Sequence, residues 1–381
     1  MTTVHTFARR KFLQQSAATL AASALPAISF AQTAAPVAPA APTERQFAPM
    51  PGNWRTFEVT TRVDIVKPQG VTRVWLPIPS VNSDWQQSME SSFSSNGQTR
   101  LTDDDKYGAR MLYVEFAENQ AQPFVELTSR ILTQNRAQNW ANRQAPAEDA
   151  ASLKYWTQPT SLLPTNGIVR TTALEATKGA STDAEKARKL YDWIVANTFR
   201  EPKVKGCGEG DIKTMLETGN LGGKCADLNA LFVGMSRSLG IPARDVYGLR
   251  VAPSAFGYKE LGGNSASLKG AQHCRAEVYL KGYGWVGMDP ADVAKVMRQE
   301  TAEWIRTPQN AVVAPVNKAL FGGWEGNWMA YNVAHDVVLP QSKGPKLGFL
   351  MYPMGENASG RLDHYAPDSF RYQITAREIT A

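Results

Sequence analysis

The sequence is poor in the residues that build disulfide frameworks and metal centres. Its 381 residues include three cysteines and four histidines, and they contain no CxxC or HxxxH pair. An odd number of cysteines leaves at least one thiol free or paired between molecules, so we expect no disulfide framework. A zinc site is disfavoured because its usual ligand spacings are missing.

Long apolar runs are also missing. Spanning a bilayer takes about 20 consecutive apolar residues, and the apolar stretch near the N-terminus is shorter and is interrupted by Pro26. This stretch follows Arg9 and Arg10, which is the pattern of a secretory signal, and the basic motif resembles the bacterial twin-arginine export signal. We therefore predict an export signal at residues 1–31, a periplasmic mature protein and no stable membrane span.

Charge of one sign is not in large excess. The formal net charge is +6, from 41 Lys and Arg against 35 Asp and Glu, and it falls to +3 when the three basic residues of the predicted signal are removed. This surplus is too small and too scattered to indicate binding to nucleic acid or to an anionic membrane. We expect Arg200, Lys203 and Lys205 to form solvated surface.

What the chain does contain is ordinary globular sequence with two kinds of periodicity. Its composition is 43% hydrophobic and 20% charged, and its length favours two or three packed units. Period-two alternation indicates antiparallel strands in the first part and again near the end, and helical spacing dominates between them. The predicted organisation is an Ala- and Pro-rich linker at 32–52, a β-sandwich-like domain at 53–135, a connector at 136–159, a catalytic core at 160–300 and a β-rich extension at 301–381.

The core contains a predicted helix that begins with a cysteine. Leu228 and Phe232 follow Cys225 at helical spacing, so the cysteine lies on the stripe that packs inward, and Gly240 ends the helix. Unpaired N–H groups and the helix dipole in the first turn favour a thiolate. A buried thiolate at a helix start requires a base beside it.

Three histidines outside the predicted signal are candidates for that base, namely His273, His335 and His364. His273 opens a predicted strand, and alternation then turns Cys274 to the opposite face, into an apolar layer. The next strand ends in Asp289, near the position opposite His273. A carboxylate there can orient the imidazole. The spacing alone leaves two hypotheses open, a Cys–His–Asp triad and a structural cysteine with an unrelated histidine.

Cys207 adds two further hypotheses. A zinc ion held by Cys207, Cys225, His273 and Asp289 is chemically conceivable because all four are ligand types, although the motif spacing disfavours it. Cys207 also lies in a glycine-rich loop, so it could form a reversible disulfide with Cys225 in an oxidising compartment. The glycines of that loop do not form a phosphate loop, because no strand precedes them and no GK[ST] follows.

Four segments resemble, in the right order, the core motifs of the transglutaminase-like superfamily: "GGKCADLNALF", "RSLGIPAR", "QHCRAEVYL" and "GWVGMDPAD". The resemblance covers about residues 160–300 and implies that Cys225 is the nucleophile, His273 the general base and Asp289 the orienting acid. It implies an α+β fold with a papain-like core, in which the Cys helix packs on an antiparallel sheet. Arg275 departs from the commonest pattern, which has an aromatic residue at that position.

The resemblance also implies an activity. The tail "FGGWEGNWMAYNVAHDVVLP" and the segment "VWLPIP" are similar to periplasmic bacterial members of the superfamily. We expect a thiol enzyme that cleaves or transfers acyl groups from amides of a protein or peptide substrate, without a cofactor or a metal. The backbone N–H of Cys225 is the expected oxyanion donor, and Tyr191 and Trp193 are weaker candidates. The alternative is a catalytically silent binding module that acts through its β domains.

Overall fold

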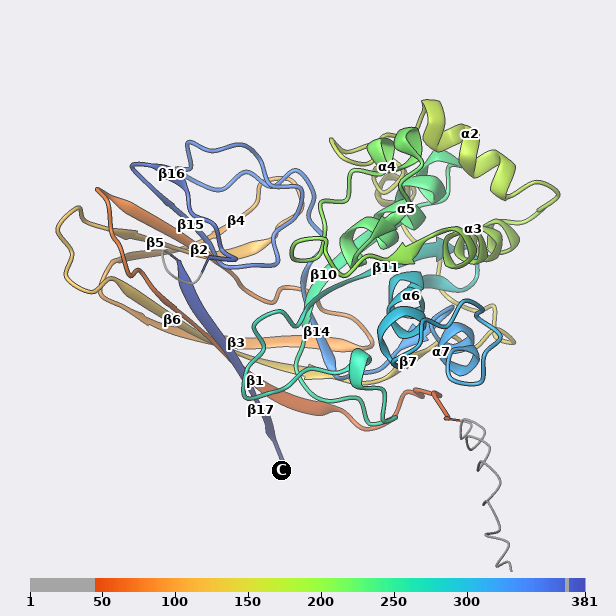
Figure 1. Cartoon of the computed structure of the whole chain (residues 1–381), viewed down its shortest axis with the longest axis horizontal. Helices are drawn as coiled ribbons and strands as arrows, with labels where there is room; N and C mark the ends of the chain where they lie inside the picture. Colours follow the sequence, from red (N-terminus) through yellow and green to blue (C-terminus); the bar gives the residue numbers. More distant parts are fainter. Residues whose placement is uncertain (1–44, 367–369, 381) are drawn as a thin grey trace, which may run out of the picture. The chain divides into compact units, whose positions relative to one another are not determined.

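The computed structural model describes residues 45–366 and 370–380. The predicted signal and most of the predicted linker therefore lie outside the described residues. Within the described part of the chain no helix is long and apolar enough to cross a membrane. The architecture is α+β, as predicted, with antiparallel sheets and a layer of helices (Figure 1).

Two sheets are formed mainly by the residues in which the sequence shows period-two alternation. In β1 every second residue is buried, from Phe57 through Val59 and Thr61 to Val63, so one face of the strand packs into the core. The first sheet has the order β17 (Arg371–Ile379), β1 (Arg55–Asp64), β6 (Phe124–Thr133) and β3 (Gln86–Ser95). The second has the order β16 (Gly360–Arg361), β15 (Met354–Asn357), β2 (Thr72–Pro77), β5 (Arg110–Phe116) and β4 (Gln98–Asp103).

The end of the chain completes both of these sheets. Strand β17 pairs antiparallel with β1 from Thr56 opposite Ile379 to Asp64 opposite Arg371, and β15 pairs with β2. Figure 1 shows β17 running beside β1. Segments about 300 residues apart in sequence therefore share one hydrogen-bonded ladder, and the C-terminal residues lie within the fold that the first strands begin.

A third sheet carries the candidate catalytic residues. Its order is β12 (Gly284–Met288), β11 (Gln272–Leu280), β10 (Ala243–Arg250) and β14 (Trp328–Asn332), and all its pairings are antiparallel. There are also two short pairs among the described residues. The pair of β13 (Gly323–Trp324) with β7 (Arg136–Ala137) contacts β12, and the pair of β8 (Phe199–Arg200) with β9 (Gly222–Gly223) contacts the helices that begin at Pro290 and Cys225.

Helix α5 (Cys225–Ser238) packs on β11 and β10, so the prediction of a Cys helix on an antiparallel sheet is confirmed. All of its residues are buried because other helices cover the faces that the sheet leaves open. The helix ends at Ser238, and Gly240, just beyond it, has a φ of 79°, as glycine allows. The remaining helices are α1 (Ala150–Tyr155), α2 (Gly167–Ala176), α3 (Asp183–Asn197), α4 (Ile212–Thr218), the short 3₁₀ turn η1 (Lys259–Leu261), α6 (Pro290–Gln299) and α7 (Ala314–Ala319).

The start of α6 differs from the strand that the sequence pattern favours at "YGWVGMDP". Strand β12 ends at Met288, and Asp289 is the N-cap of a new helix whose first residue is Pro290. Its carboxylate accepts a hydrogen bond from the backbone N–H of Asp292. An Asp–Pro pair suits this position because Asp caps the free N–H groups and Pro has none to lose. The turn from strand to helix fixes the direction of the Asp289 side chain.

Candidate active site

Cys225 is the first residue of α5, and its side chain is 3% exposed. Burial alone would raise the pKa of this thiol. Hydrogen bonds from Cys207 and Cys274, and then the hydrogen bond and charge of His273, outweigh burial and hold the pKa of Cys225 well below its usual range. The site therefore favours a thiolate paired with an imidazolium.

The structure brings His273 and Asp289 together behind this thiol. His273 Nε2 lies 2.7 Å from Asp289 Oδ2, and both side chains are buried. Strand pairing explains the contact, because Ala276 and Met288 form the last pair between β11 and β12. His273 lies three residues before Ala276 and Asp289 directly follows Met288, so both lie just beyond the same end of the paired segment. The bond to Nε2 leaves Nδ1 as the nitrogen available to sulfur. All three residues singled out in the sequence meet at one place.

A second carboxylate, which the sequence analysis did not identify, also faces the imidazole. Asp292 Oδ2 lies 3.3 Å from His273 Nε2, and Arg250 holds the same carboxylate at 2.6 Å. Burial and Arg250 oppose the charged imidazole, but the two carboxylates outweigh them and raise the pKa of His273 to about 9. The pKa of Asp289 is raised, first by burial and then by the charge of Asp292.

Arg275, which departs from the family pattern, lies on the far side of this acid. Its Nε is 3.5 Å from Asp289 Oδ2, and its guanidinium packs over the ring of Trp328 at 4.5 Å. Burial lowers the pKa of Arg275 to about 10 although Asp289 opposes the change. The guanidinium therefore supports the carboxylate instead of shaping the cleft beside the thiol, whose lining does not include Arg275.

Asn229 connects the helix to both other elements of the site. Its amide nitrogen donates to the carbonyl oxygen of Cys274 at 2.8 Å and to Asp289 Oδ1 at 3.3 Å. Its oxygen accepts from the N–H of Ala291. This buried side chain, one turn into α5, holds the start of the helix against β11 and the start of α6.

The predicted orientation of Cys274 is wrong. Its sulfur does not point away from the active thiol, since the sulfurs of Cys207, Cys225 and Cys274 lie within 4.8 Å of one another. Strand β12 pairs with β11 only from Ala276 onward, so the first residues of β11 have no neighbour on that edge. At this end of β11, therefore, both His273 and Cys274 can lie close to the Cys225 sulfur, although their side chains alternate along the strand. The three cysteines are free and buried.

The four residues considered for zinc fall into two separate groups. One is the cluster of three cysteine sulfurs, and the other consists of His273, Asp289 and Asp292. Arg250 and Arg275 contact the carboxylates of the second group, so positive charge already lies where a cation would bind. The charges therefore favour an imidazolium in this group over a metal ion.

The candidate oxyanion donors are not equivalent. The N–H of Cys225 is the first of the helix, and within the described residues it donates no hydrogen bond to the protein. Tyr191 is fully buried and donates to the carbonyl oxygen of Asn317, and neither it nor Trp193 lines the cleft. The geometry leaves the backbone donor available.

His335 and His364, the two other candidate bases, also lie outside the cleft lining. His335 is buried beside Asp245 at 3.3 Å, and burial lowers its pKa. The His364 ring packs against Tyr352 and Tyr365. Neither histidine contacts the thiol cluster in any hydrogen bond of the described residues.

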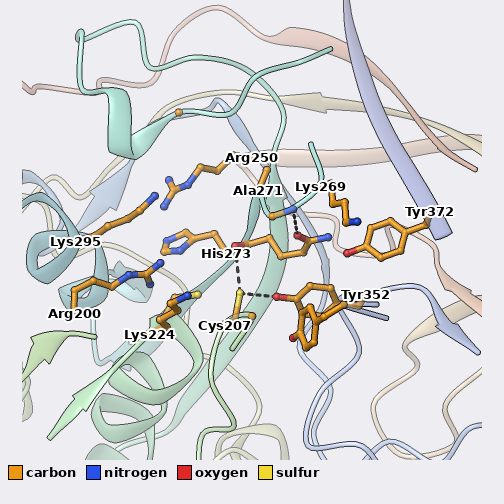
Figure 2. A pocket seen from close by; sticks show the side chains of 16 residues that line it. Arg200, Cys207, Lys224, Arg250, Lys269, Ala271, His273, Lys295, Tyr352 and Tyr372 are labelled. Atoms are coloured by element: carbon orange, nitrogen blue, oxygen red, sulfur yellow. Dashed lines mark hydrogen bonds between the residues drawn. The ribbon is translucent and has the colours of Figure 1, made fainter. Parts of the chain in front are cut away.

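The thiol opens into a cleft of about 460 Å³. Figure 2 shows Arg200, Lys224, Lys295 and Arg250 gathered on one side of His273, and Lys269, Tyr352 and Tyr372 on the other. The prediction that Arg200 belongs to solvated surface is wrong, because β8 pairs with β9 just before the Cys helix and brings it to the cleft. The residues that sequence analysis missed are Arg200, Lys224, Arg250, Lys269, Gln272, Asp292, Lys295, Tyr352, Tyr365 and Tyr372.

Comparison with known proteins identifies related sequences. A family model described as the transglutaminase-like superfamily matches residues 170–290, which include all three candidate catalytic residues. A curated relative, an uncharacterised protein of Haemophilus influenzae, is 32% identical over 343 residues, and the match covers 85% of this chain and 91% of the relative. The relationship therefore extends well beyond the matched core, into the β-rich parts on both sides.

Two solved structures resemble parts of this chain at low sequence identity. A proposed cysteine protease from Cytophaga hutchinsonii is 14% identical, with a TM-score of 0.48, and the match covers 86% of this chain and 99% of that one. The periplasmic domain of TgpA from Pseudomonas aeruginosa is 16% identical, with a TM-score of 0.33, and the match covers 69% of this chain and 93% of that one.

Proposed function

Because the chain belongs to the transglutaminase-like superfamily, we propose that it is a thiol enzyme that acts on amides through a Cys225 acyl-thioester. One observation carries the proposal: a sulfur with a lowered pKa at the start of a helix lies beside an imidazole whose far nitrogen is held by a buried carboxylate. This is the arrangement that an activated nucleophile requires. The substrate amide belongs to a peptide bond or to a glutamine side chain.

In the first half-reaction the Cys225 thiolate attacks the amide carbonyl carbon and forms a C–S bond. The carbonyl oxygen becomes an oxyanion, and the free N–H of Cys225 donates to it. The His273 imidazolium gives its proton to the amide nitrogen, the C–N bond breaks, and an amine leaves. The products of this half are the acyl-thioester and a neutral imidazole.

In the second half-reaction His273 takes a proton from the acceptor, which is water or an amine. The acceptor oxygen or nitrogen bonds to the acyl carbon, the C–S bond breaks, and the thiolate and imidazolium are restored. Water gives a protease or amidase, and an amine gives a crosslink. Asp289 keeps Nε2 protonated throughout and stabilises the imidazolium each time that it forms.

The experiment that tests the proposal combines an acyl-donor assay with a thiol-reactive acyl probe. Cys225→Ala should reduce turnover by on the order of 10⁴ or more, with unchanged thermal unfolding. Cys225 is the thiol whose pKa is lowered beside His273, whereas the Cys225 sulfur raises the pKa of Cys207 and burial raises that of Cys274. Incubation of the wild type with peptide donors and a tagged amine then separates peptide release from tag incorporation. Near-wild-type rates in Cys225→Ala would refute the mechanism, and a wild type that neither reacts with the probe nor turns over would favour the silent binding module.

We also propose that the protein acts in the periplasm after export by the twin-arginine route. The support is the basic and apolar pattern of residues 1–31. Changing both Arg9 and Arg10 to lysine should keep the protein in the cytoplasm, which cell fractionation measures. Export that continues unchanged in this variant would exclude the twin-arginine route.

A further inference from the structure

Every charged side chain among the described residues that line the cleft is basic. These residues include no aspartate or glutamate, and they include five basic side chains besides His273, namely Arg200, Lys224, Arg250, Lys269 and Lys295. Its volume of about 460 Å³ lies within the range of roughly 300–1,000 Å³ of small-ligand sites. A cleft with walls of one charge attracts molecules of the opposite charge.

Two of these cations are neutralised by the protein itself. Arg250 forms a buried pair with Asp292 at 2.6 Å, and Lys295 lies 3.3 Å from a carboxylate oxygen of Glu260. These pairs lie behind the cleft wall and explain why the two side chains are tolerated there.

The other three have no such partner. Among the described residues no carboxylate lies within 4.0 Å of the charged nitrogens of Arg200, Lys224 or Lys269. Within the described part of the chain, the Arg200 guanidinium donates only to the neutral amide of Gln299. Burial and then the charge of Arg200 lower the pKa of Lys224. These cations repel one another across the cleft, so an anion between the walls would be stabilised.

The Cys225 thiolate accounts for only part of this charge. It is a single negative charge, and it is already balanced by the His273 imidazolium. Lys269 lies across the cleft from Lys224, beside the Tyr372 ring at 5.8 Å (Figure 2). Stabilising the thiolate therefore does not explain a cation on that wall.

A buried amide next to Lys269 provides an independent indication of a ligand. Gln272 is 6% exposed, and its amide nitrogen, which faces the Tyr372 hydroxyl, makes no hydrogen bond of normal length and angle among the described residues. The backbone N–H of Gly270 donates to its oxygen at 3.0 Å, which fixes the nitrogen as the free end of the amide. A buried donor left without a full hydrogen bond is unfavourable, and this one belongs to a residue that lines the cleft.

We propose that the acyl donor carries a carboxylate, which binds between Lys269, the amide nitrogen of Gln272 and the hydroxyl of Tyr372. This inference rests on the proposed function, and it adds the substrate class. An ammonium, an amide N–H and a phenolic O–H are all donors, and a carboxylate accepts several such bonds at once. Peptides supply that group either as an acidic side chain near the reacting amide or as a free C-terminus.

The first experiment does not depend on turnover. Cys225 is alkylated with anionic iodoacetate or neutral iodoacetamide, and the rate for the Cys225 peptide is followed by mass spectrometry. The ratio of the two rates should exceed that of a neutral cysteine derivative by about tenfold or more, and it should fall as salt is added. Lys269→Gln and Gln272→Leu should each lower the ratio by about threefold or more, and Lys203→Gln, an exposed lysine outside the cleft, should leave it unchanged.

The result that overturns the inference is a wild-type ratio no higher than that of the free thiol, or a ratio that Lys269→Gln leaves unchanged. A loss caused only by Arg200→Gln would place the anion on the opposite wall and refute the assigned subsite. Because Lys269 is exposed, its substitution tests the proposal even if Gln272→Leu does not fold.

The second experiment identifies the source of the carboxylate. Matched peptide donors carry either a free C-terminus or a C-terminal amide, and either Glu or Met beside the reacting amide. A preference of about tenfold for one acidic member, lost in Lys269→Gln but kept in Lys203→Gln, is the expected result. Equal turnover of acidic and neutral donors would refute the substrate class and leave the proposed function intact. No turnover of any donor would count against the proposed function. In that case the alkylation ratio would still show whether the cleft binds a carboxylate.

Discussion

At the scale of single residues, the groups around Cys225 and His273 favour the state in which the proton lies on the imidazole and the sulfur is a thiolate. Neighbouring sulfurs and the imidazole hold the pKa of Cys225 well below its usual range, and two carboxylates raise the pKa of His273 to about 9. Between these two values both groups are charged. The ion pair is the state that can attack an amide carbonyl.

The pH profile of kcat/KM should therefore be bell-shaped. It should rise at acid pH as Cys225 ionises, and it should fall near pH 9 as the imidazolium loses the proton that the leaving amine needs. The same acid limb should govern alkylation of Cys225 by iodoacetamide, so this thiol should react at pH 6, where an ordinary thiol with a pKa of about 8.5 hardly does. An acid limb near pH 8.5 in both measurements would show that the ion pair does not form.

Asp289→Asn should reduce kcat by on the order of 10³ to 10⁴, because an amide cannot stabilise the imidazolium as a carboxylate does. The basic limb of the pH profile should also move to lower pH, since Asp289 is one of the groups that raise the pKa of His273. Asp192→Asn, in an exposed ion pair with Arg188 on α3, is the control and should change neither quantity. A loss of kcat without a shift of the basic limb would contradict the assigned role.

Oxidation should join Cys207 to Cys225. Their sulfurs lie within 4.8 Å of each other, and Cys207 belongs to a loop with three glycines of positive φ, which can close the gap to the disulfide bond length of about 2.05 Å. The bond should abolish activity, and dithiothreitol should restore it. Peptide mapping without reductant measures the pairing, and three free thiols in the oxidised protein would exclude it.

At the scale of elements, the start of α5 is held by the third residue of the helix. Asp227 accepts from the backbone N–H groups of Lys224, Glu209 and Gly210 at 2.8 to 3.0 Å. One buried carboxylate thus caps the helix and ties it to the preceding glycine loop. The loop needs glycine at Gly208, because a Cβ there would lie 1.8 Å from an Asp227 oxygen.

Asp227→Ala should lower the free energy of unfolding by about 2 kcal/mol, because it leaves three N–H groups without an acceptor. It should also slow alkylation of Cys225 at pH 6, since the first turn no longer holds the sulfur in place. Thr182→Ala removes the capping box of α3 and is the matched control. Thr182→Ala should lower the free energy of unfolding by about 1 kcal/mol and leave the alkylation rate of Cys225 unchanged. Equal alkylation rates in the two variants would show that Asp227 does not hold the Cys225 sulfur in place.

At the scale of the whole molecule, a buried group of charges joins the β-rich part to the catalytic sheet. Glu277 on β11 lies 2.5 Å from Arg136 on β7 and 2.6 Å from Arg244 on β10. Burial opposes the charged carboxylate, but Arg244 and Arg136 outweigh it and lower the pKa of Glu277 to about 2. Removing one member leaves the others buried without a partner.

Glu277→Gln should lower the free energy of unfolding at pH 7 by about 3 kcal/mol. Because the folded pKa lies below the unfolded value, the contribution of the carboxylate is present above about pH 4.5 and is lost as the pH falls towards 2. Urea unfolding of both proteins at pH 7 and pH 3 measures this. The difference between them should shrink at pH 3, and a constant difference would show that the charge of Glu277 is not its cause.

The local elements of the catalytic core follow from local patterns. Helical spacing predicted the helix from Cys225 to Gly240, and alternation predicted the strand that His273 opens. The order of the motifs predicted the superfamily, which the comparisons confirm. In contrast, the sequence pattern did not predict the helix after Asp289, because an Asp–Pro pair is typical both of the end of a strand and of the start of a helix.

The sequence by itself determined the helix, the strand and the three reactive residue types, because propensity, capping and periodicity act over a few residues. Only the tertiary structure decided that Cys274 lies beside the active thiol and that Asp292 contacts the imidazole of His273. It also decided that Tyr372, near the C-terminus, lines the same cleft as Arg200. These contacts join segments up to about 170 residues apart in sequence. Strand pairing and packing bring them together, and no local pattern carries that information.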